Sequence, residues 1–250
     1  MEHINKRIHL HQTASTNTYV KELLAAGVDL PDMTLVDADY QTGGRGQKGN
    51  SWESEPGANL LFSLLIRPRN VLANRQFVIS QAIALAVQQE LASMVDGTTV
   101  KWSNDIYWHD RKVCGILIEC TLEGPYVRDC IVGVGLNVNQ ETFVGDAPNP
   151  VSLHQIIGLT LDREKLLERI VARFDHYYTM AQDGSGQELS NLYCANLYRR
   201  TGFFLYQEPG GEPFEAQVSD VDSMGYLSLT LRNGEVRRYE FKQVRFIIEA

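Results

Sequence analysis

The residues best suited to chemistry lie in a glycine-rich segment at residues 40–52, YQTGGRGQKGNSW. Its Gly-x-Gly-x-x-Gly spacing begins at Gly44 and ends at Gly49, and it carries two cations, Arg45 and Lys48. Glycines free backbone N–H groups to turn toward an anion, and an arginine can hold a phosphate or carboxylate through two hydrogen bonds. The segment therefore predicts an anion-binding loop. The alternative is a mobile surface loop with solvated charges.

The residues around the loop exclude the two standard nucleotide loops. A Rossmann loop opens a helix and is followed about 20 residues later by an acidic residue. Here Pro56 and a strand pattern follow, and residues 56–89 contain no Asp or Glu. A Walker loop needs Gly-Lys-Ser/Thr, whereas Lys48 precedes Gly49. What remains is a basic glycine loop followed by Trp52, whose indole could stack on a purine or cap the loop.

Three further motifs carry polar groups in apolar surroundings. KWSND at 101–105 ends a strand-like run, KVCGILIE at 112–119 opens an apolar strand with Lys112, and GVGLN at 133–137 places Asn137 in a buried run. The structural alternatives are a turn, a lysine guarding a strand edge and a satisfied buried amide. Each alternative is ordinary by itself. The occurrence of all four motifs in this order favours a site.

The elements that must position these groups follow from hydrophobic periodicity. Alternating or continuous apolar runs predict strands within residues 8–17, 33–39, 59–68, 98–108, 111–120 and 126–139. Apolar stripes of helical period predict helices at 16–27, 76–94 and 162–180, the last with Asp162 as N-cap.

The pattern changes near residue 201. Short strands then recur every 8–12 residues, and Asn233-Gly234 marks a tight hairpin turn. We therefore expect a main domain at 1–200 and a small all-β domain at 201–250. The main domain is predicted to be α+β, with a mixed, largely antiparallel sheet flanked by helices.

Composition limits the class of protein. The 250 residues carry 23 Lys+Arg and 31 Asp+Glu, a net charge of −8, which argues against broad non-specific binding to nucleic acid or anionic membrane. None of the four cysteines forms a Cys-x-x-Cys pair or has a histidine at zinc-finger spacing, so we expect no cysteine-held metal and a reducing compartment. There is no signal-peptide-like start and no apolar window of about 18 residues. These features predict a soluble cytoplasmic protein.

Together with Ser15-Thr16-Asn17, the four motifs closely resemble those of biotin protein ligases, enzymes that activate biotin with ATP and attach it to a lysine of a carboxylase carrier domain. The resemblance covers residues from about 13 to 140. It implies an SH2-like, class II synthetase-like catalytic domain and a C-terminal SH3-like domain. Some relatives carry an N-terminal winged helix; here the first motif starts at Ser15, so neither that domain nor DNA binding is expected.

The resemblance also implies roles for individual residues. Implied biotin contacts are Ser15, Thr16, Asn17, Gln41, Gly44, Arg45, Lys112, Gly115 and Ile116. Implied ATP or adenylate contacts are Arg45, Gln47, Asn50, Trp52, Asn104, Lys112 and Asn137. Gln47 and Asn50 stand where the family usually has arginines, and Ser103 stands in place of a proline. The glycine loop is expected to close over the activated intermediate.

Three residues are expected to act in catalysis. Attack of a carboxylate on ATP brings two anions together, which Lys112 and Arg45 would neutralise. The resemblance implies that Asp105 orients or deprotonates the acceptor lysine. Mg²⁺ is expected to arrive with ATP, with no metal held by the chain. The expected partner is a biotin carboxyl carrier protein or carrier domain, and the chain is expected to be a monomer or homodimer.

Two alternatives remain. One is a lipoate ligase or octanoyl transferase of the same superfamily. In one branch the octanoyl transferases need a nucleophilic cysteine, and the strand-interior position of Cys114 argues against that. The other is a non-enzymatic ligand-sensing or nucleic-acid-binding module, which the acidic pI of about 5.3 and the lack of a helix-turn-helix disfavour.

Overall fold

A computed structural model of the chain describes residues 3–47, 50–145 and 149–248. Two residues of the glycine loop that the sequence pattern singled out, Lys48 and Gly49, lie outside the described residues. Within the described residues, no helix is both long enough and apolar enough to span a membrane.

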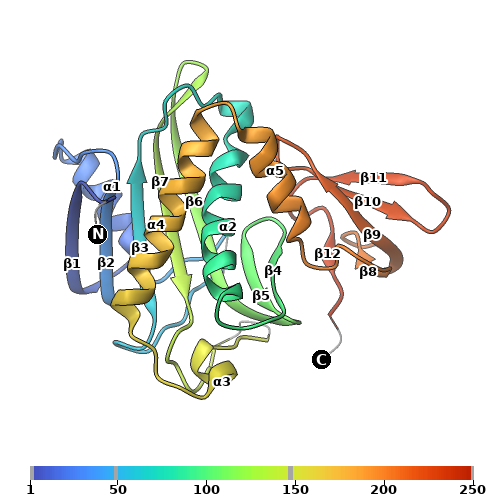
Figure 1. The fold of residues 1–250 in the computed structure, drawn as a ribbon, viewed down its shortest axis with the longest axis horizontal. Helices are drawn as coiled ribbons and strands as arrows, with labels where there is room; N and C mark the ends of the chain where they lie inside the picture. Colours follow the sequence, from blue (N-terminus) through green and yellow to red (C-terminus); the bar gives the residue numbers. More distant parts are fainter. Residues whose placement is uncertain (1–2, 48–49, 146–148, 249–250) are drawn as a thin grey trace.

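The main body is built on a seven-stranded sheet in the order β1-β2-β3-β7-β6-β5-β4 (Figure 1). The strands are β1 Lys6–Thr13, β2 Thr34–Gln41, β3 Leu60–Ile66, β4 Thr98–Lys101, β5 Asp105–Trp108, β6 Arg111–Glu123 and β7 Tyr126–Leu136. Only β1 and β2 pair in parallel, and the other pairs in this sheet are antiparallel. The predicted mixed, largely antiparallel sheet is confirmed.

Helices cover this sheet unequally. They are α1 Thr16–Ala25, α2 Phe77–Ala92, α3 Leu153–Ile157, α4 Arg163–Gln182 and α5 Gly186–Ala195, with a short 3₁₀ turn at Ala73–Arg75. The three predicted helices are confirmed, including the Asp162 cap, which accepts a hydrogen bond from the Lys165 N–H at 3.1 Å. The sequence pattern did not predict α3 or α5. Figure 1 shows α2 and α4 side by side on one face of the sheet, with α1 on the β1–β2 side.

Alternation along the central strands separates two surfaces. In β3, Phe62 and Leu64 join the large core under α2 and α4, whereas Leu65 joins a smaller cluster with Val20 of α1. In β7, Ile131 shares the α1 side, and glycines follow it at every second position. Because side chains alternate across a strand, these glycines leave room on the face opposite α2 and α4.

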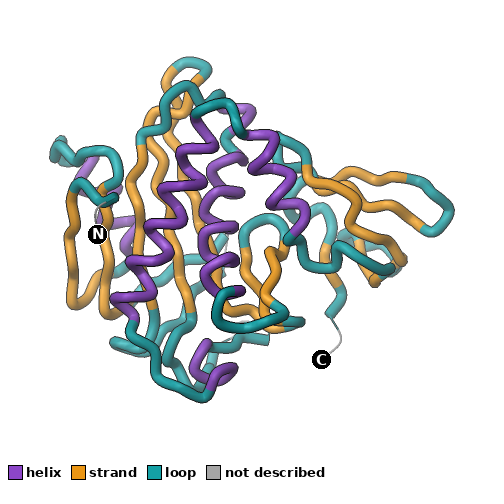
Figure 2. Tube along the Cα trace, in the orientation of Figure 1, coloured by secondary structure: helices purple, strands orange, loops and turns teal. Residues whose placement is uncertain are grey.

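Residues after 203 form a second, five-stranded sheet in the order β11-β10-β9-β8-β12. Its strands are β8 Phe204–Gln207, β9 Phe214–Val221, β10 Leu227–Leu231, β11 Val236–Tyr239 and β12 Arg245–Phe246. Figure 2 shows this part as strands and loops, as predicted. The β10–β11 turn contains Asn233-Gly234, with Gly234 at φ +86°, which a glycine adopts without strain. The division into domains near residue 200 stays a prediction.

One predicted element is wrong. The single strand expected at 98–108 is two antiparallel strands, β4 and β5, joined by a turn at 102–104. Ser103 and Asn104 are turn-forming residues, and this local preference outweighs the apolar residues on either side. The predicted join at 109–110 between β5 and β6 is confirmed, and His109 there has φ +49°.

Candidate active site

A cavity of about 610 Å³ lies where α1, the glycine loop, the β4–β5 turn and the start of β6 meet. Its volume is in the range of small-molecule sites. All the site residues expected from the sequence line it except Gly44, whose carbonyl instead accepts the Trp52 N–H at 2.9 Å at the base of the loop. Motifs spread over more than 120 residues are thus brought to one place.

A buried polar network forms the α1 side of the cavity. The Gln41 side-chain oxygen accepts the Thr16 N–H at 2.7 Å. The Ser63 hydroxyl lies 2.7 Å from Thr16 Oγ1 and 2.6 Å from Asn17 Oδ1. Ser15, Thr16 and Asn17 are all at most 5% exposed. Such a small set of fixed polar groups can orient a ligand in a pocket.

Asn17 ties this network to the carboxylate of Glu119 on β6. Its amide donates to Glu119 Oε2 at 2.9 Å and to the Leu117 carbonyl at 3.2 Å. Lys21 donates to the other carboxylate oxygen of Glu119 at 2.6 Å. Burial opposes ionisation of Glu119, but the hydrogen bonds from Lys21 and Asn17 outweigh it, so the pKa of Glu119 is lowered. The carboxylate of Glu119 is therefore held ionised beside this wall of the cavity, paired with the Lys21 ammonium.

The described part of the glycine loop is a small hairpin. The Gly46 N–H donates to the Asn50 carbonyl at 2.8 Å, and the backbones of Arg45 and Ser51 form an antiparallel β-bridge. Gln47 reaches across the cavity and donates to Asn104 Oδ1 at 2.8 Å. Asn104 in turn donates to the Ile116 carbonyl on β6. A neutral amide contact thus joins the loop to the β4–β5 turn.

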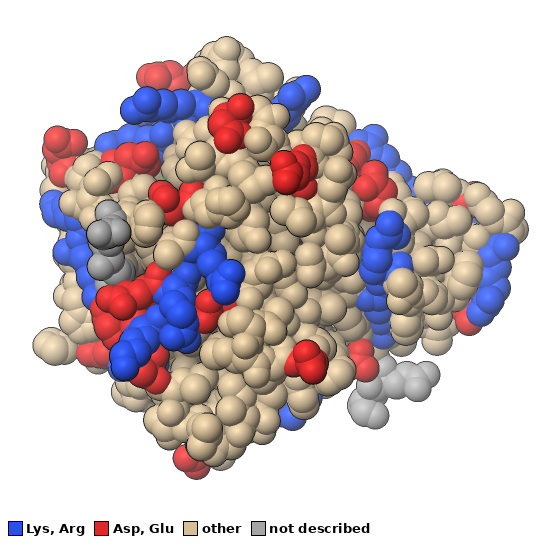
Figure 3. Space-filling view, in the orientation of Figure 1, with Lys and Arg blue, Asp and Glu red and all other residues tan. Residues whose placement is uncertain are grey.

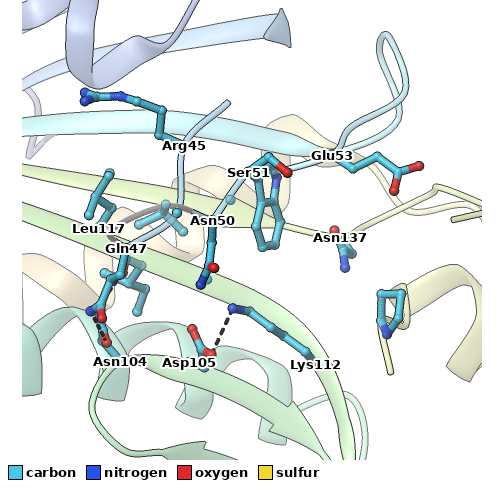
Figure 4. Close-up of a pocket in the computed structure, with 18 of the residues that line it drawn as sticks. Arg45, Gln47, Asn50, Ser51, Glu53, Asn104, Asp105, Lys112, Leu117 and Asn137 are labelled. Carbon is cyan, nitrogen blue, oxygen red and sulfur yellow. Dashed lines mark hydrogen bonds and ion pairs between the residues drawn. The ribbon is translucent and has the colours of Figure 1, made fainter. Parts of the chain in front are cut away.

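Arg45 points away from the centre of the cavity. Its guanidinium donates to Thr18 Oγ1 at 3.1 Å and lies 3.6 Å from Glu119 Oε2. Figure 4 shows it directed away from Lys112 and Asp105. Arg45 and Lys112, which were both expected to neutralise the reacting anions, therefore lie on different sides of the site in this conformation.

Lys112 and Asp105 form an ion pair within the cavity, with Lys112 Nζ 2.8 Å from Asp105 Oδ2 (Figure 4). The β5–β6 hairpin brings them together, since it pairs Asp105 with Gly115 and Tyr107 with Lys112. Both side chains are about one-quarter exposed, so they can meet a ligand. A cation and a carboxylate at this distance can respectively neutralise an anion and accept a proton.

The indole of Trp52 packs against two glycines, Gly115 and Gly135. A Cβ at Gly115 would come within 2.9 Å of the ring, and a Cβ at Gly135 within 2.4 Å. The Lys112 ammonium lies 5.7 Å from the ring centroid. The Trp52 Nε1 is buried without a hydrogen-bond partner among the described residues. The absence of side chains at these two strand positions is thus what admits the tryptophan.

Asn137 closes the β7 end of the cavity. Its amide nitrogen donates to the Val151 carbonyl at 3.2 Å, whereas its Oδ1 is buried and has no partner in the described parts of the chain. A buried amide oxygen left unpaired in this way is available to a ligand or a ligand-bound ion.

The lining or supporting residues that were not expected as site residues include Ser63, Glu119, Lys101 and Phe241. Ser63 had a signal, because it is a lone polar residue inside the apolar strand LLFSLLI. Lys101 lies beside two aromatic rings, and burial lowers its pKa. Phe241 comes from the C-terminal sheet region and contacts Trp102, a pairing that no local pattern indicates.

The chain matches known proteins over this same region. The model of the Biotin/lipoate A/B protein ligase family matches residues 10–137. The chain is 36% identical over 171 residues to the bifunctional ligase/repressor BirA of Bacillus spizizenii, an alignment that covers 66% of this chain and 51% of that protein. It is 29% identical over 222 residues to the biotin–[acetyl-CoA-carboxylase] ligase of Mycobacterium tuberculosis, covering 87% and 80%.

The solved structures agree on the fold. The biotin protein ligase of Aquifex aeolicus in complex with biotin and ATP superposes with a TM-score of 0.79 at 22% identity, covering 98% of this chain and 100% of that one. The chain spans about half the length of the Bacillus relative. Because the family match covers just over half of the 250 residues and includes the motifs that line the cavity, the chain belongs to the biotin/lipoate A/B protein ligase family.

Proposed function

We propose that this chain is an ATP-dependent biotin protein ligase. It would convert biotin and ATP to biotinyl-5′-AMP and pyrophosphate, and then transfer biotin to a lysine of a biotin carboxyl carrier domain. The observation that carries the proposal is the Lys112–Asp105 ion pair, which faces the same cavity as the polar network around Thr16 and Gln41. The end of the cavity at Thr16 and Gln41 can hold a small polar head group. The end at Lys112 and Asp105 can neutralise an anion and accept a proton.

In the first step, a biotin carboxylate oxygen attacks the α-phosphorus of ATP, and the bond to the pyrophosphate oxygen breaks. Two anions must approach each other, so the Lys112 ammonium would neutralise the oxygens at the reacting centre. Arg45 contacts Thr18 and Glu119 in the structure, and its proposed role requires the guanidinium to turn inward. ATP enters as its Mg²⁺ complex, in which the metal offsets charge on the leaving pyrophosphate.

In the second step, a neutral lysine amine of the carrier attacks the acyl carbon of the mixed anhydride, and AMP leaves with the bonding electrons. The Asp105 carboxylate would orient this amine or accept the proton that it loses. Its partner Lys112, at 2.8 Å, would remain beside the departing phosphate. No covalent intermediate with the enzyme is needed.

Biotin recognition would use the network on α1 and β2. The ureido group of biotin offers both donors and an acceptor, and the groups at Ser15, Thr16 and Gln41 offer matching partners. The nucleotide part would lie toward Trp52, Asn104 and Asn137, where an indole face and polar amides line the cavity. The M. tuberculosis and A. aeolicus relatives, described by their names as acting on or binding biotin, support this assignment.

A cysteine-dependent acyl transferase is the less favoured alternative. Cys114 is 0% exposed and joins the apolar core, and burial raises the pKa of its thiol far above the ordinary value. A neutral thiol without access to substrate is a poor nucleophile.

The decisive experiment is pyrophosphate exchange into ATP, measured with biotin, lipoate or octanoate as the acid, followed by transfer to a carrier domain. We expect exchange and transfer with biotin alone. Exchange with lipoate and none with biotin would contradict the assignment.

Lys112→Met keeps the apolar stem beside Trp52 and removes the charge. We expect it to slow adenylate formation by about 10²–10³-fold, the usual cost of losing one group that stabilises transition-state charge. Lys165→Ala, at an exposed lysine on α4, is the matched control and should be unchanged. Turnover by Lys112→Met within threefold of the parent chain would show that the lysine has another role.

A further inference from the structure

A second concave surface lies away from the cavity, where β1, β2 and the start of α4 meet. Lys, Arg, Asp and Glu side chains of both signs gather over this region (Figure 3). In the same region, His9 and His11 of β1 and Asp39 of β2 offer three ligand atoms that lie within 4.8 Å of one another. None of the three lines the candidate active site.

The spacing of these atoms fits a tetrahedral metal ion. Asp39 Oδ2 lies 3.4 Å from His9 Nε2 and 3.4 Å from His11 Nδ1. Zn²⁺ binds histidine nitrogen and carboxylate oxygen at about 2.0–2.2 Å, and two ligands on a tetrahedron at such lengths are about 3.4 Å apart. The His11 side chain is 96% exposed, so its ring can rotate to complete the site.

Neighbouring groups orient two of the three ligands. His9 Nδ1 lies 2.7 Å from Asp37 Oδ2, and Arg7 holds the Asp37 carboxylate through two hydrogen bonds, at 2.8 and 3.0 Å. A carboxylate on Nδ1 leaves the Nε2 lone pair free for a metal, an arrangement typical of histidine ligands. Arg163 lies 3.4 Å from Asp39 Oδ1 and leaves Oδ2 facing the histidines.

We propose that His9, His11 and Asp39 bind one Zn²⁺ ion per chain. Two imidazoles and one carboxylate form a donor set suited to zinc, whereas Mg²⁺ and Ca²⁺ prefer oxygen ligands alone. This differs from the expectation that the chain holds no metal of its own. It also does not depend on the proposed ligase activity.

The ion would cross-link β1 to β2 a short distance before β2 reaches the cavity at Gln41. Both strands end at the register pair Thr13 and Gln41, and Gln41 belongs to the polar network that contacts Thr16. Gln41 is two positions beyond Asp39 on the strand, which is about 7 Å. Bound zinc would therefore stabilise the strand pair that carries one wall of the cavity.

The test is titration of the full chain with Zn²⁺, followed by competition with a chromophoric chelator and by thermal unfolding. We expect one ion per chain and a rise in Tm of roughly 5–10 °C when free Zn²⁺ is a hundred times its Kd. His11→Ala should weaken binding at least tenfold without loss of folding, because that side chain is almost wholly exposed. Millimolar Mg²⁺ should not compete.

Two controls exclude other zinc ligands. His176→Ala removes an exposed histidine elsewhere on the chain, and Cys120→Ser disrupts the thiol pair with Cys130, whose sulfurs lie 2.9 Å apart. Both variants should bind Zn²⁺ as the parent chain does. Unchanged binding by both His11→Ala and Asp39→Asn would overturn the proposal, as would loss of binding in Cys120→Ser. The absence of any binding at about 100-micromolar Zn²⁺, a concentration far above the Kd of a structural zinc site, would overturn it too.

Discussion

Gly135→Ala tests whether the glycines under Trp52 exist to admit the indole. The added Cβ would lie 2.4 Å from Trp52 Cε2 and 2.7 Å from Nε1. Carbon atoms pack at about 3.5–4.0 Å, so the ring must retreat by roughly 1 Å or more. β7 is held between β3 and β6, whereas Trp52 sits on a loop. We therefore expect the tryptophan, and not the strand, to move.

Two free energies decide how the variant behaves. Overpacking typically costs about 1–3 kcal/mol, and the lower value is expected where the neighbour is a loop side chain. For a chain of this size, about 1 kcal/mol lowers Tm by about 2–4 °C. If Trp52 stacks on the adenine, its displacement forfeits about 1–3 kcal/mol of binding, which is roughly a 5- to 150-fold rise in Kd for the nucleotide. The loss of affinity should thus exceed the loss of stability.

The assay is calorimetric titration with biotin and a non-hydrolysable ATP analogue, together with thermal unfolding. Gly186→Ala is the matched control, since a Cβ there would meet only Val78 Cγ2, at 3.9 Å. The refuting result comes from a double-mutant cycle. In a Trp52→Ala background, Gly135→Ala should have almost no further effect on nucleotide affinity. Additive effects of the two substitutions would show that the glycine serves another purpose.

Three further predictions concern the supports of the site. Asn17→Ala removes a buried amide that has three hydrogen-bond partners on two strands, β3 and β6, and it should lower the free energy of unfolding by about 1–3 kcal/mol in denaturant titration; an unchanged midpoint would contradict this. Gln47→Ala breaks the contact with Asn104, worth about 1 kcal/mol, so trypsin should cut the loop about fivefold faster, and equal cleavage would argue against the contact. Burial opposes ionisation of Asp129, but hydrogen bonds from Arg67 and a second arginine lower its pKa. That carboxylate therefore stabilises the fold above its ordinary pKa of about 3.8 and loses this effect as pH falls through the lower folded value. Asp129→Asn should flatten the acid limb of a stability–pH curve, and an unaltered limb would refute the assignment.

Several parts of the fold were predictable because the signals are local. Asp162 caps α4, Gly27 ends the first helix region at φ +73°, and Asn233-Gly234 lies in the β10–β11 turn. Each depends on the preferences of a few adjacent residues. The wrong prediction of one strand at 98–108 has the same local origin. Strand-forming residues flank the turn-forming pair at 103–104 on both sides and hide it in the sequence pattern. Helix α2 was expected to have one apolar stripe, but it is buried on nearly all sides between the sheet, α4 and α5.

The candidate site was predictable to a different degree. The motifs named nearly all the residues that line the cavity, including Lys112 and Asp105. They did not indicate that Arg45 would face Glu119, or that Phe241 would come from the C-terminal region. Ser63 was visible as a polar residue in an apolar strand, but its partners lie 46 and 47 residues away.

The sequence alone determined which residues have the chemistry: a glycine loop with a cation and an indole, a lysine and an aspartate near one hairpin, and polar groups at the start of a helix. It also determined most of the elements, although not α3, α5 or the division of 98–108 into two strands, because helical and strand periods depend on local spacing. Only the tertiary structure decided which groups meet. The parallel register of β1 with β2 sets His9 and His11 beside Asp39, although α1 separates the two strands along the chain. Such pairings depend on how every element packs at once, because burying both faces of the sheet selects one register, and no single segment carries that information.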